Sequence, residues 1–318
     1  MLVGRSQDPL PLYPLAAGVD LFFVISGFIM VYSSEDMFGR SGAPRTFLLR
    51  RIARIVPLYW VLSAAAIFIM RTPVTTEIVI KSFLFIPYLG PSGAMQPLYG
   101  VGWTLNFEMF FYLLFAAAIL LPREAAGATA AFALLAGIAA GYFLQPSMAI
   151  LQFWSDPIVV EFAFGIMLAI ACRRGLSLPR WAGAALCVAG AAAIWHSFPQ
   201  NPPTSRCRWL ECGVPAAMIF AGIALQPPLT PRVFRWFAIL GDASYSMYLL
   251  HSLVLSGIIR LWSHGLNTYP MRVVLLCGFL LTVVASIASY HVFEMPAAKA
   301  LRGLRPGRSR RLLERPVA

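Results

Sequence analysis

The stretch "GVDLFFVISGFIM", Gly18 to Met30, decides the fold class of this chain. No charged side chain follows Asp20 in this run, and with its flanks, residues 16–33, it is long enough to cross a bilayer as a helix. Asp20 stands at the entrance of that helix, where a carboxylate can accept hydrogen bonds from the free N–H groups of the first turn. We therefore predict a membrane-spanning helix and a structural, capping role for Asp20.

The composition of the whole chain indicates the same class. Hydrophobic residues make up 59% of the 318 residues, charged residues only 12%, and the mean hydropathy is +0.73, values far from those of soluble domains. They predict an all-α, polytopic membrane helix bundle that forms a single domain over residues 1–318. About nine transmembrane helices are expected, at residues 16–33, 52–70, 100–121, 125–144, 156–172, 181–196, 212–226, 239–262 and 271–293. The apolar segment Ile78 to Leu89 is short and contains Lys81 and Pro87, so we expect it to be interfacial or re-entrant.

Arginine and lysine indicate the orientation, because positively charged loops stay in the cytoplasm during insertion. With the N-terminus outside, 18 of the 25 basic residues fall on the inner side. The opposite orientation would reverse that ratio, so we predict an outer N-terminus and a cytoplasmic C-terminus. The net charge of +12 is then a topology signal, and the basic tail 299–318 is expected to meet anionic lipid head groups rather than nucleic acid.

An outer N-terminus combined with an odd number of spans makes the start of the chain unusual. Residues 1–15 are rich in proline and too short to form a signal peptide or a spanning helix. We expect that a first helix, entered from the inner side, is missing from this sequence. The alternative is that a short N-terminal tail is simply translocated.

Ionisable side chains inside the predicted spans are the first candidates for function, because a charge at the centre of a membrane helix costs about 2.5–3.5 kcal/mol on the insertion scale. Glu108 lies deep in its span, with Tyr112 one turn further on the same helix face. His251 lies in the middle of another span and can exchange a proton near neutral pH. For Glu108 and His251 we favour a functional role over packing in a polar network.

Other polar residues give weaker signals. Glu161 and Glu294 stand in or at the ends of spans, and Pro296 after Glu294 suggests that a helix ends there. The five cysteines show no spacing typical of a metal site. Cys207 and Cys212 fall near the outer side, where they could form a disulfide or remain two free thiols, and the sequence does not decide between these alternatives.

A third candidate lies at the inner mouth of the second predicted span, in "RTFLLRRIARIVPLYW", Arg45 to Trp60. Arg51 and Arg54 are three residues apart and therefore share a helix face. Such a pair can bind phosphate oxygens through paired hydrogen bonds. Five arginines in this loop also satisfy the positive-inside rule, and on spacing alone a plain membrane anchor is favoured.

Five sequence blocks resemble a known family when they are taken in order and spacing. They are "GVDLFFVISGFIM", "RRIARIVPLYW", "GWTLNFEMFFYLLF", "LGDASYSMYLLH" and "HVFEMP". Together they are similar to acyltransferase family 3 of integral membrane proteins, and within it to the bacterial exopolysaccharide-production acetyltransferases. The likeness spans nearly the whole chain. It implies ten membrane helices in the bacterial inner membrane and transfer of an acyl group, often acetyl from acetyl-CoA, to extracytoplasmic sugars.

The resemblance also implies roles for individual residues. Arg51 and Arg54 match the family's R-x-x-R, which is implicated in handling the acyl-CoA donor, and this raises phosphate binding above the anchor role. Glu108 and His251 match the acidic residue and the histidine of two other blocks, so they are the expected catalytic residues. No metal is expected. The family's first helix carries an arginine and a histidine taken as the catalytic centre, and we expect that helix to be missing from this sequence, as the topology also predicts.

The function implied is a membrane O-acyltransferase that moves an acyl group, with acetyl expected, from acyl-CoA to a hydroxyl of an extracytoplasmic polysaccharide or glycan. One alternative is a catalytically inactive remnant of the family, which the absent helix would explain. Another is a polytopic transporter or flippase for a lipid-linked sugar. A transporter should show repeat-related halves or paired broken helices, and the sequence shows neither.

Overall fold

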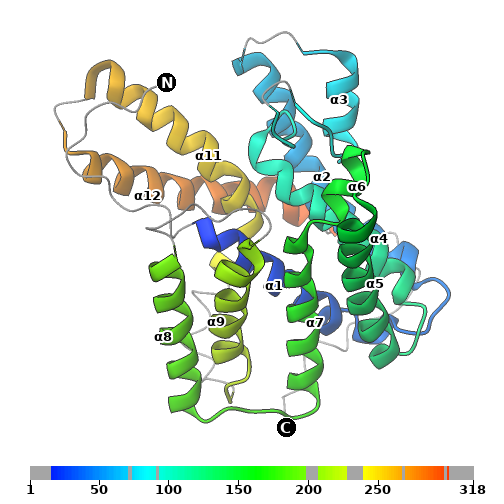
Figure 1. The fold of residues 1–318 in the computed structure, drawn as a ribbon. Helices are drawn as coiled ribbons and strands as arrows, with labels where there is room; N and C mark the ends of the chain where they lie inside the picture. Colours follow the sequence, from blue (N-terminus) through cyan, green and yellow to red (C-terminus); the bar gives the residue numbers. More distant parts are fainter. Residues whose placement is uncertain are drawn as a thin grey trace. The chain divides into compact units, whose positions relative to one another are not determined.

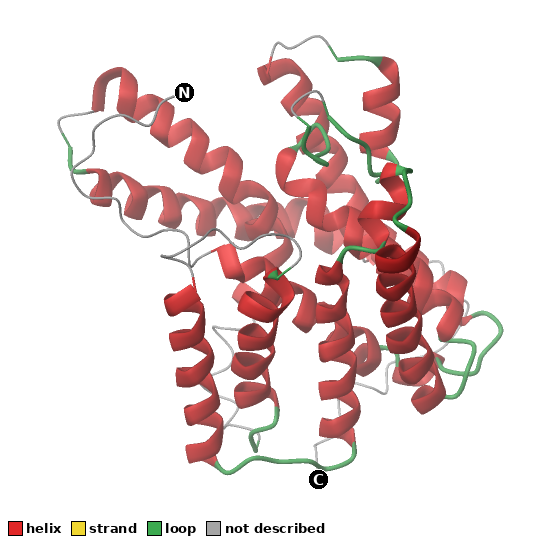
Figure 2. Ribbon diagram, in the orientation of Figure 1, coloured by secondary structure: helices red, strands yellow, loops and turns green. Residues whose placement is uncertain are grey.

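The helical prediction is confirmed by a computed structural model, which describes residues 16–70, 74–90, 93–197, 207–227, 239–266, 269–296 and 299–300. Within these ranges every regular element is a helix, and turns and loops join the helices (Figure 2). The predictions for residues 1–15 and for most of the basic tail fall outside the described residues.

Each of the nine predicted spans coincides with a helix in the described ranges. These helices are α1 (Gly18–Ser33), α2 (Ala43–Met70), α4 (Trp103–Ala118), α5 (Arg123–Leu144), α7 (Val160–Arg173), α8 (Arg180–Ser197), α9 (Val214–Ala224), α11 (Ser244–Leu261) and α12 (Met271–Ser289). Four helical stretches are long and apolar enough to cross a membrane, namely Ala43–Phe68, Gly100–Ala118, Arg123–Leu144 and Met271–Glu294. The total of about nine spans stays a prediction.

Short helices complete the described secondary structure. They are η2 (Glu35–Met37), α3 (Thr76–Phe83), η3 (Gly100–Gly102), α6 (Ala149–Trp154), η4 (Pro157–Val159), η5 (Trp209–Gly213), η6 (Trp262–Leu266) and η7 (Tyr290–Glu294). Of the segment Ile78 to Leu89, only the part up to Phe83 is helical. Its helix α3 begins where the Thr75 hydroxyl accepts a hydrogen bond of 3.3 Å from the Ile78 N–H, a regular N-cap.

The chain forms two compact units, which are described separately. The first comprises Met1–Phe47 and Thr75–Leu229, and the second comprises Leu48–Val74 and Thr230–Ala318. In the first unit α1 packs along α7, and α8 lies beside α9 (Figure 1). In the second unit α11 packs along α12. The single domain over residues 1–318 stays a prediction.

Helices α1 and α7 cross at two glycines. A Cβ atom on Gly27 would lie 2.1 Å from the carbonyl oxygen of Phe162, and one on Gly165 would lie 2.0 Å from that of Val24. Small residues allow such backbone contact, which is a common way for membrane helices to pack. Beside the crossing, the rings of Phe23 on α1 and Phe162 on α7 pack against each other with centroids 4.8 Å apart. Glycine and aromatic packing together therefore fix α1 against α7.

Loops that the topology assigns to the inner side meet at one end of the first unit. Glu35, which follows α1, pairs with Arg173 at the end of α7 and with Arg123 at the start of α5, the latter at 3.1 Å. The hydrogen bond from Arg173, assisted by the charges of Arg173 and Arg123, holds the pKa of Glu35 below its ordinary value. Glu124 and Arg174 form a more exposed pair nearby, at 3.5 Å. This pairing agrees with the predicted alternation of loops, while the side that faces the cytoplasm stays a prediction.

The predicted outer end of the first unit contains a buried ion pair. Arg208 donates from Nε to Asp20 Oδ1 at 2.9 Å and from Nη2 to Asp20 Oδ2 at 2.7 Å. The same guanidinium donates to the carbonyl oxygen of Ala16 at 3.0 Å. Helix α1 has no side-chain hydrogen bond at its N-cap. The predicted capping role of Asp20 is therefore wrong: its carboxylate pairs with an arginine that lies 188 residues away in sequence.

Candidate active site

Glu108 lies in a buried polar cluster in the first unit. Helix α4 begins directly after the η3 turn and carries Glu108 about one and a half turns inward, where the side chain is 4% exposed. The Ser26 hydroxyl on α1 donates to Glu108 Oε1 at 3.2 Å, and the Tyr112 hydroxyl donates to the same oxygen. Two helices thus supply donors to one carboxyl group.

This arrangement makes Glu108 suited to proton transfer. The predicted proximity of Tyr112, one turn along the helix, is confirmed. A carboxylate held by two hydroxyl donors keeps a fixed orientation and can still take up a proton. Ser26 was not singled out as a site residue from the sequence. Its hydroxyl within the apolar stretch Gly18 to Met30 could have indicated one, because a buried hydroxyl needs a hydrogen-bond partner.

The second unit contains Arg54 in an ion pair. Arg54 Nε lies 3.6 Å from Glu294 Oε2, and the arginine side chain is 42% exposed while the glutamate is 4% exposed. The Ser246 hydroxyl on α11 donates to Glu294 Oε1 at 2.7 Å. Helical structure continues beyond Glu294 through Pro296. Glu294 is the last residue of the apolar helical stretch Met271–Glu294, as expected for a residue at the end of a span, and its carboxyl group contacts α11 and α2.

Arg51 lies one turn before Arg54 on α2, as the spacing predicted, and its side chain is half-buried. The Tyr245 hydroxyl donates to the backbone carbonyl of Ile55 at 2.6 Å, which joins α11 to the same part of α2. The two arginines therefore stand on a section of α2 that contacts both α11 and η7.

His251 is half-buried on α11, and its Nδ1 contacts the carbonyl oxygen of Tyr248. A contact of this kind favours the tautomer that carries the proton on Nδ1 and leaves Nε2 as a hydrogen-bond acceptor. Of the four predicted site residues, Glu108 belongs to the first unit, and Arg51, Arg54 and His251 belong to the second.

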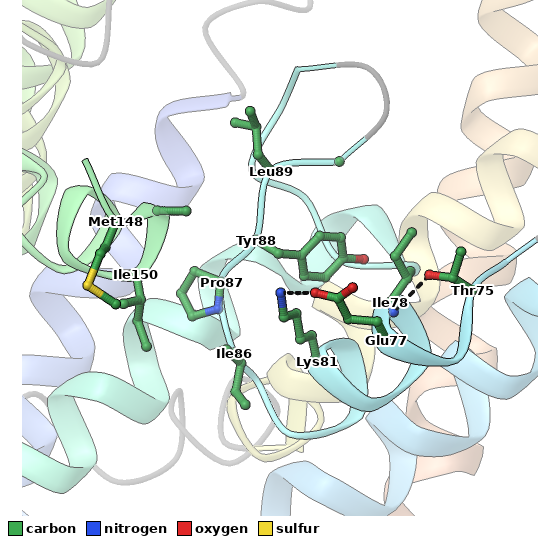
Figure 3. A pocket seen from close by; sticks show the side chains of 12 residues that line it. Thr75, Glu77, Ile78, Lys81, Ile86, Pro87, Tyr88, Leu89, Met148 and Ile150 are labelled. Carbon is green, nitrogen blue, oxygen red and sulfur yellow. Dashed lines mark hydrogen bonds and ion pairs between the residues drawn. The ribbon is translucent and has the colours of Figure 1, made fainter. Parts of the chain in front are cut away.

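A pocket of about 580 Å³ opens between two segments of the first unit that the topology assigns to the outer side. It lies between residues 75–90 and the start of α6, where Met148 and Ile150 face Pro87 (Figure 3). Lys81 donates a hydrogen bond to Glu77 at its edge and lowers the pKa of that carboxyl group. The pocket therefore combines apolar walls with one ion pair.

The described ranges contain no group of three or more His, Cys, Asp or Glu residues placed to hold a metal ion. All five cysteines are free thiols, including Cys207, which is exposed, and Cys212, which is buried. Cys207 and Cys212, for which the sequence left both a disulfide and free thiols as alternatives, are thus unpaired in this structure.

One family model, described as an acyltransferase domain, matches residues 6–291, a range that includes Arg51, Arg54, Glu108 and His251. The chain belongs to acyltransferase family 3. As a member of acyltransferase family 3, it is an acyltransferase enzyme, and the match covers α1, α4, α7 and α11 in full. This confirms the family resemblance seen in the sequence.

Two curated proteins are similar over most of this family 3 chain. One is the "Exopolysaccharide production protein ExoZ" of Rhizobium meliloti (strain 1021), 34% identical over 311 residues that cover 93% of this chain and 92% of that protein. Another is the "Acyltransferase MdmB" of Streptomyces mycarofaciens, 26% identical over 338 residues, with 91% of this chain and 82% of that protein covered. No solved structure matches the chain.

Proposed function

We propose that this enzyme moves an acyl group, with acetyl expected, from acyl-CoA to a hydroxyl of an extracytoplasmic polysaccharide or glycan. The observation that supports this most directly is the likeness to a protein of exopolysaccharide production over 93% of the chain. We place the enzyme in the bacterial inner membrane, with the donor on the cytoplasmic side. The positive-inside pattern supports this orientation.

Arg51 and Arg54 are proposed to bind the phosphates of the donor. The gap of 3.6 Å between Arg54 and Glu294 exceeds hydrogen-bond length, so the carboxylate holds the guanidinium by charge. With a side chain that is 42% exposed, Arg54 can present donors to a phosphate group from solution. Glu294 then acts as a positioning residue for Arg54.

Replacing Arg54 with Ala is expected to raise the KM for acyl-CoA about tenfold or more, because a charge-assisted hydrogen bond contributes about 1.5–3 kcal/mol. Replacing Arg51 with Ala should act in the same direction. Arg50→Ala is the matched control. Arg50 is an exposed arginine on the same turn of α2, and its loss removes the same positive charge from the predicted inner side. Steady-state kinetics in proteoliposomes measures the effect, and an equal KM change in all three variants would indicate a membrane anchor instead.

The transfer step needs a proton acceptor. The acceptor hydroxyl oxygen attacks the thioester carbonyl carbon, the carbon–sulfur bond breaks, and the sulfur of CoA leaves and takes up a proton. Glu108, held by Ser26 and Tyr112, is proposed to accept the hydroxyl proton or to orient the base that does. His251 is proposed to handle a proton on the acceptor path, since its Nε2 can serve as an acceptor.

The pocket between residues 75–90 and α6 is proposed as the surface where the glycan acceptor binds. Its apolar walls fit the C–H faces of a sugar ring, and its ion pair offers both a donor and an acceptor to ring hydroxyls. The segments that form it belong to the predicted outer side, where an extracytoplasmic acceptor would arrive.

Filling this pocket with Met148→Trp is expected to raise the KM for the glycan severalfold and to leave the KM for acyl-CoA unchanged. Phe143→Trp is the control, because Phe143 is 78% exposed near the end of α5 and does not line the pocket. Initial rates with each substrate varied in turn separate the two effects. A Met148→Trp enzyme with wild-type kinetics for both substrates would place the acceptor elsewhere.

The function itself is tested with the purified full chain in proteoliposomes, labelled acetyl-CoA and a purified exopolysaccharide. We expect the labelled acetyl group to become attached to the polysaccharide and to be released by alkali, because esters of hydroxyl groups hydrolyse in base. Movement of a lipid-linked sugar across the bilayer without acyl transfer would instead favour the transporter alternative.

A further inference from the structure

A further buried carboxyl group, Glu161, lies outside the proposed site. It belongs to the first turn of α7 at the predicted outer end, and its side chain is 0% exposed. Neither of its oxygens accepts a hydrogen bond from a donor group within the described residues. A Cβ atom on Gly213 would lie 2.5 Å from Glu161 Oε1, so the backbone of η5 closes one side of the carboxyl group.

The group that faces Glu161 is another carboxyl group. Asp20, which is also 0% exposed, lies on α1, and α1 and α7 pack along each other and both contact η5, so the two carboxyl groups face each other at this junction. Both oxygens of Asp20 already accept hydrogen bonds from Arg208, so this guanidinium is committed to Asp20. The other titratable groups that face this pair, on the elements packed against it, are Asp156, Glu211 and Cys212.

Two carboxylates and one guanidinium leave an uncompensated negative charge in a site without water access. Burial of an unpaired charge is costly, and two carboxylates in contact repel each other. A single proton removes both penalties, because a protonated carboxyl group is neutral and donates the hydrogen bond that its neighbour accepts. This is the arrangement found wherever two acids share one site.

We propose that Asp20 and Glu161 form a buried proton-binding site, in which Glu161 holds the proton and donates it to Asp20. Arg208 neutralises the charge that remains on Asp20. The ligand of this site is a proton, and the proposal does not depend on the identity of the acyl donor or the acceptor.

Infrared spectroscopy of the full chain in lipid bilayers tests the proposal without an activity assay. The carbonyl stretch of a protonated carboxylic acid is expected at neutral pH in the wild-type protein and should be lost in Glu161→Gln. Glu124→Gln is the control, because Glu124 is 65% exposed in its pair with Arg174 and should leave the band unchanged. Absence of the band in the wild-type protein, or its persistence in Glu161→Gln, would overturn the proposal.

Stability gives an independent readout. The side-chain amide of Glu161→Gln is neutral and can donate to Asp20 as the proposed acid does, so the thermal midpoint should stay within a few degrees of wild type. Asp20→Asn should instead free Arg208 to pair with an ionised Glu161, which also removes the infrared band. A Glu161→Gln protein that fails to fold, or an Asp20→Asn protein that keeps the band, would show that the two carboxyl groups do not share a proton.

Discussion

Replacing Glu108 with Gln should lower the rate of acyl transfer by about 100-fold or more, the usual contribution of a general acid or base. The amide of Gln fills the same space and its oxygen can still accept from Ser26 and Tyr112, so the fold should survive. What the variant loses is the ability to take up a proton. The kcat for acyl transfer in proteoliposomes measures the effect, with the thermal midpoint as a check on folding.

Tyr112→Phe is the companion variant for Glu108. It removes one donor to the same carboxyl group but leaves the proton acceptor in place, so a smaller loss of kcat is expected. Full activity in Glu108→Gln would remove this residue from the chemistry and leave it a packing role. An equal loss in both variants would suggest that the orientation of the carboxyl group matters more than its proton.

Gly165→Val is expected to prevent stable packing of the first unit. The new Cβ would lie 2.0 Å from the carbonyl oxygen of Val24 and 2.7 Å from the backbone nitrogen of Phe28, and neither atom can move without the helix. Overpacking of a rigid contact costs about 1–3 kcal/mol and sometimes more, and here two backbones must separate. Thermal unfolding and the monodisperse fraction in size-exclusion chromatography should both fall sharply.

Gly137→Val separates packing from helix propensity. Gly137 lies within α5, and a Cβ atom there would meet nothing within 4 Å. Both substitutions introduce the same β-branched side chain into a helix, so the propensity change is matched. Similar losses in Gly137→Val and Gly165→Val would refute the backbone contact as the cause.

The helices could be predicted from sequence because hydropathy and chain continuity are local properties. The nine predicted segments all contain helices, and the proximity of Tyr112 to Glu108 follows from the helical repeat. Within the described residues, four helical stretches have the length and composition to cross a membrane, and the apolar helices Gly18–Ser33 and Trp209–Ala224 are shorter.

The polar contacts between helices could not be predicted in the same way. Arg208 counted only as a basic residue near the outer side, and its pairing with Asp20 depends on how η5 approaches α1. The pair of Arg54 and Glu294 likewise joins residues 240 positions apart, which no periodicity in one helix can reveal. A buried charge predicts that a partner exists, but packing decides which one.

The glycine crossing of α1 and α7 has a mechanical consequence. Two backbones in direct contact have no layer of side chains between them that could compress or change rotamer, so the two helices should move as one rigid rod. Asp20 and Ser26 both lie on α1. A displacement of α1 would therefore change the ion pair with Arg208 and the hydrogen bond to Glu108 together. A movement that admits a substrate should therefore occur at another helix–helix interface and leave the contact between α1 and α7 intact.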